Sequence, residues 1–229
     1  MTNTPRSSLH ILREEIVDCR RCPRLVRWRE KVGREKVKRF EDEEYWARPV
    51  PGFGDPQARL LLVGLAPAAH GANRTGRMFT GDESGRWLYR ALHKAGFANR
   101  QESINRDDGL TLTDCYITAS LRCAPPLNKP TPKELDTCRP FLMDELRLLK
   151  AVRVIIGLGK IGFETALRAY RDASLISFKK KPAFAHAVVH RLDPFVFIAS
   201  YHPSQQNTFT GKLTKSMFDR IFRLAKKEL

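Results

Sequence analysis

Apolar residues follow two alternating patterns along this chain. Four short runs are largely apolar, at 60–63, 115–121, 152–159 and 195–200. Such runs are typical of strands buried on both faces of a parallel sheet. Four longer stretches repeat apolar residues every three or four positions, which predicts amphipathic helices at 84–95, 131–149, 160–170 and 214–225. Strands that alternate with helices predict an α/β fold whose sheet is covered on both sides.

Capping residues indicate where these helices begin. Ser8 is a suitable N-cap for a further amphipathic helix that leads to a pair of cysteines. Ser84 is the predicted N-cap of the helix over 84–95. Thr131 and Glu134 have the spacing of a capping box, and Pro132 between them suits the first helical position. Pro140 is expected to kink or interrupt the helix that follows.

Three segments fit neither pattern. Residues 27–46, RWREKVGREKVKRFEDEEYW, are densely charged and are interpreted either as a solvated insertion or as a binding element. The stretch 49–56 is rich in Pro and Gly and is predicted to be a loop that enters the first strand. Residues 179–190 are irregular, and we expect an edge hairpin there.

Length and charge narrow the class of protein. The chain has 229 residues, which suits one domain, 1–229, with residues 1–56 as an N-terminal part packed on it. Its net charge of +16 favours a polyanionic partner, although a ribosomal or membrane-surface protein can be equally basic. No stretch approaches the roughly 20 apolar residues of a membrane span, and MTNTPRSSLH lacks the apolar core of a signal peptide. We therefore expect a cytoplasmic protein.

Four of the five cysteines form a candidate metal site. Cys19 and Cys22 are a C-x2-C pair, and Cys123 and Cys138 follow much later. Paired cysteines in a cytosolic chain are more often metal ligands than disulfides. Four thiolates suit a structural zinc or a [4Fe–4S] cluster, and the wide gap between the pairs favours the cluster. Cys115, inside a predicted strand, is interpreted as a core residue.

Polar side chains gather in the loops that follow three of the strands. The loop after 60–63 delivers His70, Phe79 and Asp82, the second loop carries Asn128, and the third begins with His202 in a His-Pro-Ser turn. Because loops at the carboxyl ends of parallel strands converge, these side chains are expected to surround one pocket. The alternatives are an ordinary solvated loop and a structural histidine.

Such a pocket suits a planar polar ligand. An aromatic ring can stack on a nucleobase that has been flipped out of a helix, and an amide can read its edge. Hydrolytic removal of a base passes through an oxocarbenium-like sugar and an anionic leaving base. Asp82 would orient water and stabilise the cation, and His202 would donate to the departing base. The loop that follows His202 is the predicted source of a side chain to fill the vacated stack.

Three ordered motifs and the four cysteines resemble those of the type B, or family 5, uracil-DNA glycosylases. The motifs are GLAPAAHGANRTGRMFTGD at 64–82, CAPPLNKPTP at 123–132 and YHPSQQNTFTGKLT at 201–214. The resemblance implies a three-layer α/β/α sandwich around a four-stranded parallel sheet. It also implies an N-terminal segment bound to a [4Fe–4S] cluster, and removal of uracil, hypoxanthine and other damaged bases from DNA.

The resemblance also implies roles for individual residues. Asp82 and His202 would be catalytic, and Cys19, Cys22, Cys123 and Cys138 would hold the cluster. Phe79 would stack on the base and Asn128 would read it, within a substrate site formed by Gly64, Ala68, His70, Phe79, Asn128 and Ser204. The expected partner is double-stranded DNA, with single-stranded DNA as a further substrate, no membrane, and a monomeric protein.

One departure from the wider superfamily affects the mechanism. Related glycosylases carry an acid or an amide in the first motif, where this chain has only Leu65, Ala66 and Ala68. Asp82 must then substitute if catalysis is acid-assisted. This gap leaves a non-catalytic binder of damaged DNA as the chief alternative, and an RNA-directed protein with a four-cysteine zinc module as a weaker one.

Overall fold

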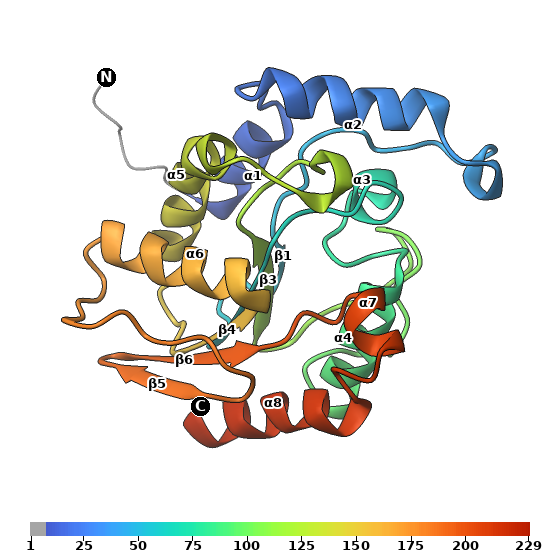
Figure 1. The fold of residues 1–229 in the computed structure, drawn as a ribbon. Helices are drawn as coiled ribbons and strands as arrows, with labels where there is room; N and C mark the ends of the chain where they lie inside the picture. The colour runs from blue at the N-terminus through green and yellow to red at the C-terminus, as the bar shows by residue number, and fades with distance from the viewer. Residues whose placement is uncertain (1–7) are drawn as a thin grey trace.

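The computed structural model describes residues 8–229 and has a central sheet with helices on both faces (Figure 1). Within that range six strands form one sheet in the order β1-β3-β2-β4-β6-β5. The strands are β1 Phe53–Gly54, β2 Leu60–Gly64, β3 Cys115–Ala119, β4 Val154–Leu158, β5 Val189–Leu192 and β6 Phe195–Ser200. The four predicted strands are β2, β3, β4 and β6, and neighbouring members of this set are parallel.

The expected count of four strands is wrong because two short antiparallel strands extend the sheet. At one edge, β1 is only two residues long and lies within the Pro- and Gly-rich loop. At the other edge, β5 forms an antiparallel hairpin with β6, so the hairpin expected within residues 179–190 lies further along the chain, at 189–200. Neither strand is a run of apolar residues, so hydrophobic patterning alone does not reveal them.

The central strands bury both faces. In β2, Leu60 and Leu62 contribute to one hydrophobic core, and Leu61 and Val63 contribute to the other. Helices α4 and α8 cover the first face, and α5 and α6 cover the second. The main helices are α1 Leu9–Val17, α2 Pro23–Glu35, α4 Glu83–Lys94, α5 Pro132–Leu148, α6 Gly159–Asp172 and α8 Lys215–Glu228. The short ones are η1 Lys38–Phe40, α3 Ala72–Thr75, η2 Pro126–Asn128 and α7 Gln205–Phe209.

The predicted helix starts are largely confirmed. Ser8 caps α1, and the capping box of α5 has both of its hydrogen bonds, between Thr131 and Glu134. Helix α5 continues through Pro140, so of the two expected effects, a kink or an interruption, the interruption is wrong. The cap of α4 is also different, because Asp82 and not Ser84 occupies the N-cap position.

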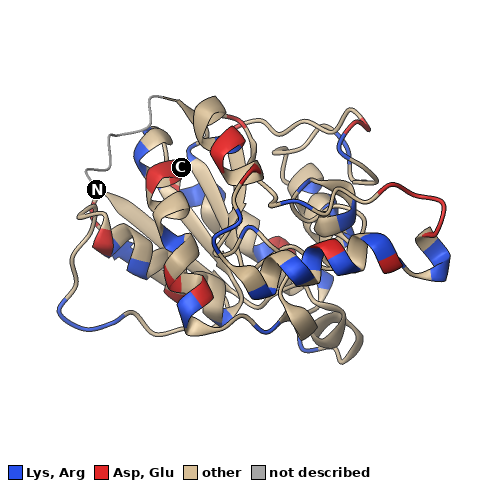
Figure 2. Cartoon of the chain, turned by 90° about the horizontal axis from the view of Figure 1, so that it is seen from above, with Lys and Arg blue, Asp and Glu red and all other residues tan. Residues whose placement is uncertain are grey.

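The N-terminal part of the chain packs on the rest of the described structure. Helix α1 contacts α5. Residues 27–35 belong to α2, which buries Arg29 and Val32, so a solvated insertion is a wrong interpretation for this part of the charged segment. Lys and Arg positions are spread over helices and loops throughout the described residues (Figure 2).

Within residues 8–229, no helix is both long enough and apolar enough to cross a membrane. Residues 1–7, which contain most of the segment considered as a signal peptide, lie outside the described residues.

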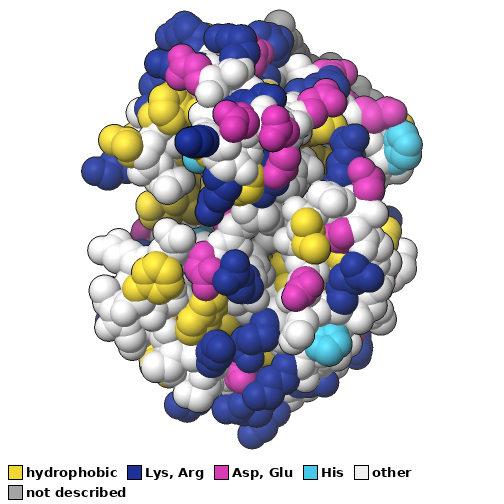
Figure 3. Space-filling view, turned by 90° about the vertical axis from the view of Figure 1, so that its right-hand side faces the viewer, with side chains coloured by type: hydrophobic (Ala, Val, Ile, Leu, Met, Phe, Trp, Pro, Cys, Tyr) yellow, Lys and Arg dark blue, Asp and Glu magenta, His cyan; other side chains and the backbone are white. Residues whose placement is uncertain are grey.

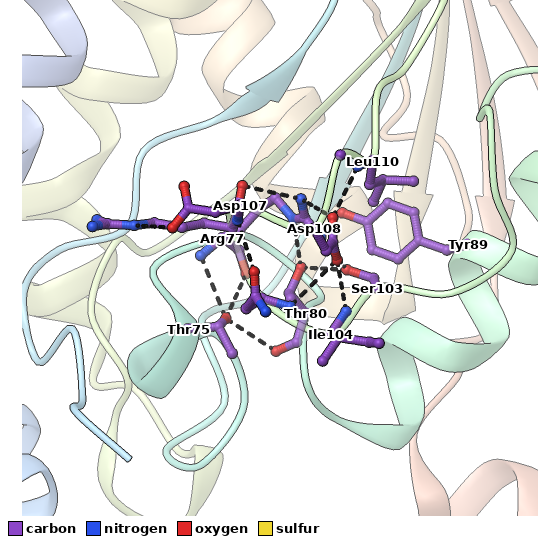
Figure 4. A network of polar contacts seen from close by, with 12 residues as sticks. Thr75, Arg77, Thr80, Tyr89, Ser103, Ile104, Asp107, Asp108 and Leu110 are labelled. Carbon is purple, nitrogen blue, oxygen red and sulfur yellow. Dashed lines mark hydrogen bonds and ion pairs between the residues drawn. The ribbon is translucent and has the colours of Figure 1, made fainter.

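A buried ion pair braces the loop between β2 and α4 (Figure 4). Arg77 and Asp108 are 4% and 6% exposed and form two hydrogen bonds, of 2.9 and 2.6 Å. The guanidinium also donates to Thr80, whose hydroxyl lies 2.6 Å from that of Ser103. The connection between α4 and β3, residues 95–114, therefore supports the loop in which the candidate site residues lie.

Asp108→Asn is expected to destabilise the fold by roughly 3 kcal/mol, because it leaves a buried guanidinium without its counterion. Burial alone would raise the pKa of Asp108, but hydrogen bonds from Arg77 and from two backbone N–H groups lower it to about 2. The depressed pKa contributes about 2 kcal/mol at neutral pH, and this is lost as the pH falls from about 4 to about 2. Urea unfolding of both proteins across this range measures the difference.

The matched control is Asp107→Asn, since the Asp107 side chain is 84% exposed. Equal stabilities for the Asp108 variant and this control would contradict a bracing role for the buried pair.

Candidate functional site

The three predicted loops meet in one cavity of about 660 Å³ at the carboxyl edge of the parallel strands. The face that carries η1, α3 and α7 is hollowed, with Lys and Arg side chains on both sides of the hollow (Figure 3). Seven predicted site residues line the cavity: Ala68, His70, Phe79, Asp82, Asn128, His202 and Ser204. A larger cavity, about 840 Å³, lies beside α1 and β1, but none of the predicted site residues lines it.

Gly64 lies behind the cavity wall and determines where Phe79 sits. A Cβ at Gly64 would lie 2.8 Å from the Phe79 ring, so only glycine lets the ring rest on the end of β2. Phe79 itself has a positive φ of 54°, which is uncommon for a residue with a side chain. Its ring stacks on the His202 imidazole, with centroids 5.9 Å apart and planes at 29°. The two rings thus form one wall.

Asp82 combines a structural role with a position in the cavity. Its Oδ1 accepts a hydrogen bond of 2.8 Å from the Gly85 N–H as the N-cap of α4. The other oxygen lies close to Gly71, where an added Cβ would be 2.3 Å away. Burial raises the pKa of Asp82, and hydrogen bonds from the first turn of α4 offset only part of that effect. A carboxylate with a raised pKa is a stronger base toward water.

His202 occupies the opposite loop. Asn207 donates to its backbone carbonyl at 2.9 Å, which fixes the turn after β6. The residue as a whole is half-buried and lines the cavity, and burial lowers the pKa of its imidazole to about 4. His202 is therefore neutral at physiological pH and carries one N–H that can donate a hydrogen bond.

His70 contacts the charged segment 27–46, for which the sequence left two interpretations open. The Tyr45 hydroxyl lies 3.0 Å from its Nδ1, and burial, with Arg39 and Arg74 nearby, lowers the pKa of His70. Arg74 donates to the carbonyls of His70 and Gly81, at 2.9 and 3.1 Å, and so links two separate segments of the loop.

The remaining predicted residues lie at the cavity mouth. Asn128 is exposed and has a positive φ of 55°, and Ser204 caps the short helix α7. Sequence reasoning did not name as site residues several others that line the cavity, among them Arg39, Glu83, Leu127 and Gln206. Arg39 was hidden within the charged run at 27–46, and no local signal distinguished the other three.

The four cysteines of the predicted metal site line one small cavity. Cys19 follows α1, Cys22 caps α2, Cys123 follows β3 and Cys138 lies in α5. Cys115 is fully buried in the core of the sheet, as expected. All five cysteines are free thiols.

The surroundings of this cavity are cationic and largely buried. Arg29 and Arg122 are almost fully buried beside the thiols, and Arg29 donates to the Cys123 sulfur at 2.9 Å. Burial raises the pKa of Cys123 to about 11 and that of Cys138 to about 12. In the described part of the chain, no three His, Cys, Asp or Glu residues are arranged to hold a single metal ion. Four soft donors beside two buried cations suit an anionic thiolate cluster in their chemistry.

The fold is that of an α/β protein, and the cavity lined by Phe79, Asp82 and His202 lies at the carboxyl ends of parallel strands, where open α/β sheets commonly bind ligands. Residues 51–226 match the family model of the uracil DNA glycosylase superfamily, and the chain belongs to that superfamily.

Named relatives resemble the chain over nearly its whole length. The Type-5 uracil-DNA glycosylase of Mycobacterium leprae is 53% identical, with 96% of this chain and 95% of that protein covered. The Type-5 enzyme of Thermus thermophilus is 51% identical over 93% of this chain and 95% of its own length. That of Pyrobaculum aerophilum is 41% identical, with coverages of 97% and 94%.

His202 should titrate at a pH far below that of an ordinary imidazole. Because burial disfavours its charged form, we expect a midpoint near the pKa of about 4 for His202. NMR of protein labelled in its histidine rings measures this midpoint, and His202→Gln identifies the signal. A His202 resonance that titrates near about 6.5, the ordinary value, would show that the imidazole is well hydrated.

Proposed function

We propose that this protein is a DNA repair enzyme, a family 5 (type B) uracil-DNA glycosylase. It hydrolyses the N-glycosidic bond of uracil and other deaminated bases, including hypoxanthine, and leaves an abasic site. The observation that carries the proposal is a single cavity lined by Phe79, Asp82, Asn128 and His202 in a chain of this superfamily. The Type-5 names of relatives at 41–54% identity support it.

The proposed reaction begins with a nucleotide flipped into the cavity. Phe79 stacks on the base and Asn128 reads its polar edge. The Asp82 carboxylate, through the oxygen that does not cap α4, orients the attacking water and stabilises the sugar cation. Neutral His202 donates its N–H to the oxygen of the departing base, which gains negative charge as the bond breaks.

Apolar side chains in the first loop influence which bases the cavity accepts. Leu65, Ala66 and Ala68 line the cavity and bring no polar group to it. They leave room for purines as well as uracil. The same apolar wall favours the second candidate function, a binder of damaged DNA without turnover, which an activity measurement distinguishes.

The proposal includes a [4Fe–4S] cluster held by Cys19, Cys22, Cys123 and Cys138. Its support is the single cavity that these four thiols line and the two buried arginines beside them. Hydrolysis needs no electron, so the cluster would supply a rigid link among α1, α2, β3 and α5. The chain would then be one domain over 1–229, with residues 1–56 fastened to it.

Duplex DNA is the proposed partner, and single-stranded DNA a further one. The charge of +16 and the basic side chains around the hollow support contacts to phosphates (Figure 3). A base-reading enzyme needs no second copy of itself, and we propose a monomer that works in the cytoplasm.

Removal of the Asp82 carboxylate should lower the rate of excision and spare DNA binding. Asp82→Asn keeps an N-cap oxygen, whereas Asp82→Ala also loses the cap, which is worth about 0.5–2 kcal/mol. We expect Asp82→Asn to slow single-turnover excision roughly 10²–10⁴-fold on both uracil and hypoxanthine duplexes, since the sugar cation is common to them. His202→Ala should cost about 10²–10³-fold, and less for bases that leave more easily.

Glu83→Gln is the matched control, because Glu83 lines the same cavity but accepts a hydrogen bond from Trp87 at 3.1 Å. A fully active Asp82→Asn would remove this carboxylate from the mechanism. Wild-type protein that binds uracil-containing duplexes and produces no abasic sites would identify the non-catalytic binder.

Loss of one proposed ligand should abolish cluster binding. Cys138→Ser is expected to lose bound iron and visible absorbance, and to unfold at a lower temperature because α5 and the N-terminal helices lose their link. Cys115→Ala is the control and should keep its iron, since Cys115 lies in the core of the sheet. Stoichiometric zinc without iron in anaerobically purified protein would contradict the cluster.

A further inference from the structure

A large apolar side chain stands exposed at the mouth of the candidate active site. Leu127 is 80% exposed and lines the cavity together with Asn128. Both residues have positive φ angles, 54° and 55°. A leucine in this backbone region is strained, and strain of this kind persists only where the surrounding structure imposes it.

The turn around Leu127 is anchored on both sides. Asn128 and Lys129 donate backbone hydrogen bonds to Pro125 and Pro126, at 3.2 and 3.0 Å. Arg24 of α2 donates to the Lys129 carbonyl at 3.2 Å. Because prolines restrict the backbone and α2 holds the far end, the turn is a stiff support for an exposed side chain.

The loop after His202 offers a different surface. Its residues on the cavity are Ser204, Gln205 and Gln206, all polar. Phe209, at the end of α7, is 75% exposed but does not line the cavity. The loop after His202 was expected to supply the side chain that fills the vacated stack. The exposed apolar residue at the cavity mouth lies instead on the Pro126–Asn128 turn, which favours that turn as the source.

We infer that Leu127 is the wedge that enters the base stack when a nucleotide is flipped into the cavity. The inference rests on the proposed glycosylase function. Flipping breaks stacking on both sides of the target nucleotide, and apolar side chains replace that stacking in proteins that distort DNA. Leu127 precedes Asn128, so one turn would fill the gap and read the extruded base at the same time.

The test compares Leu127→Ala with wild-type protein on three DNAs: uracil in a single strand, uracil opposite guanine, and uracil opposite a pyrene nucleotide. Pyrene fills the space of the base pair and expels the uracil without help from the protein. We expect Leu127→Ala to slow single-turnover excision opposite guanine roughly 10- to 100-fold. Single-stranded uracil should be excised at the wild-type rate, and pyrene should restore the duplex rate. Leu127→Met should behave like wild type.

Phe209→Ala is the matched control for an exposed apolar residue outside the cavity. A Leu127→Ala rate that falls equally on single strands and duplexes, or does not fall, would overturn the inference. So would a duplex-specific, pyrene-rescued loss in Phe209→Ala with Leu127→Ala unaffected.

A second readout separates the wedge from the proposed function. 2-Aminopurine placed beside the uracil becomes fluorescent when it unstacks, and this requires binding but no excision. The wedge predicts a smaller fluorescence rise for Leu127→Ala, even if the wild-type protein excises nothing. An equal rise in both proteins would overturn the wedge, whereas an inactive wild type would overturn only the glycosylase.

Discussion

Burial of β2 on both faces is the constraint from which the rest of the site follows. This strand lies between β3 and β4, and all five of its residues are buried. The loop that leaves its carboxyl end must satisfy its own polar groups within the protein. Arg74 donates to two carbonyls of that loop, those of His70 and Gly81, and Arg77 pairs with Asp108. Two guanidinium groups outside the cavity therefore shape it.

The same burial sets the protonation states inside the cavity. It raises the pKa of Asp82 and lowers that of His202, so both groups are driven toward their neutral forms. The N-terminus of α4 opposes this for Asp82, because a backbone N–H donates to the carboxylate. No comparable partner for the His202 ring nitrogens is found among residues 8–229. The proposed hydrolysis needs an anionic Asp82 and a neutral His202.

Sequence patterns predicted those parts of the fold that depend on interactions between residues close in the sequence. The apolar run of β2 and the capping box of Thr131 are encoded by neighbours in the sequence, and the meeting of three loops follows from parallel topology. Asp82 and Ser84 are both good N-caps, and sequence alone does not choose between them. The burial of Arg29 depends on Cys123, a residue 94 positions away. The exposed Leu127 depends on an anchored turn that no periodicity records.

Helix α2 joins the cysteine cavity to the candidate active site. Its Arg29 donates to Cys123 through the side chain, and accepts a hydrogen bond of 3.3 Å from Asn73 through its backbone carbonyl. Asn73 is fully buried in the loop between β2 and α4, and its backbone carbonyl binds the Ala47 N–H at 2.9 Å. Any movement of α2 would thus reach the loop that carries Phe79. A cluster that immobilises α2 would stabilise the shape of the substrate cavity without entering the reaction.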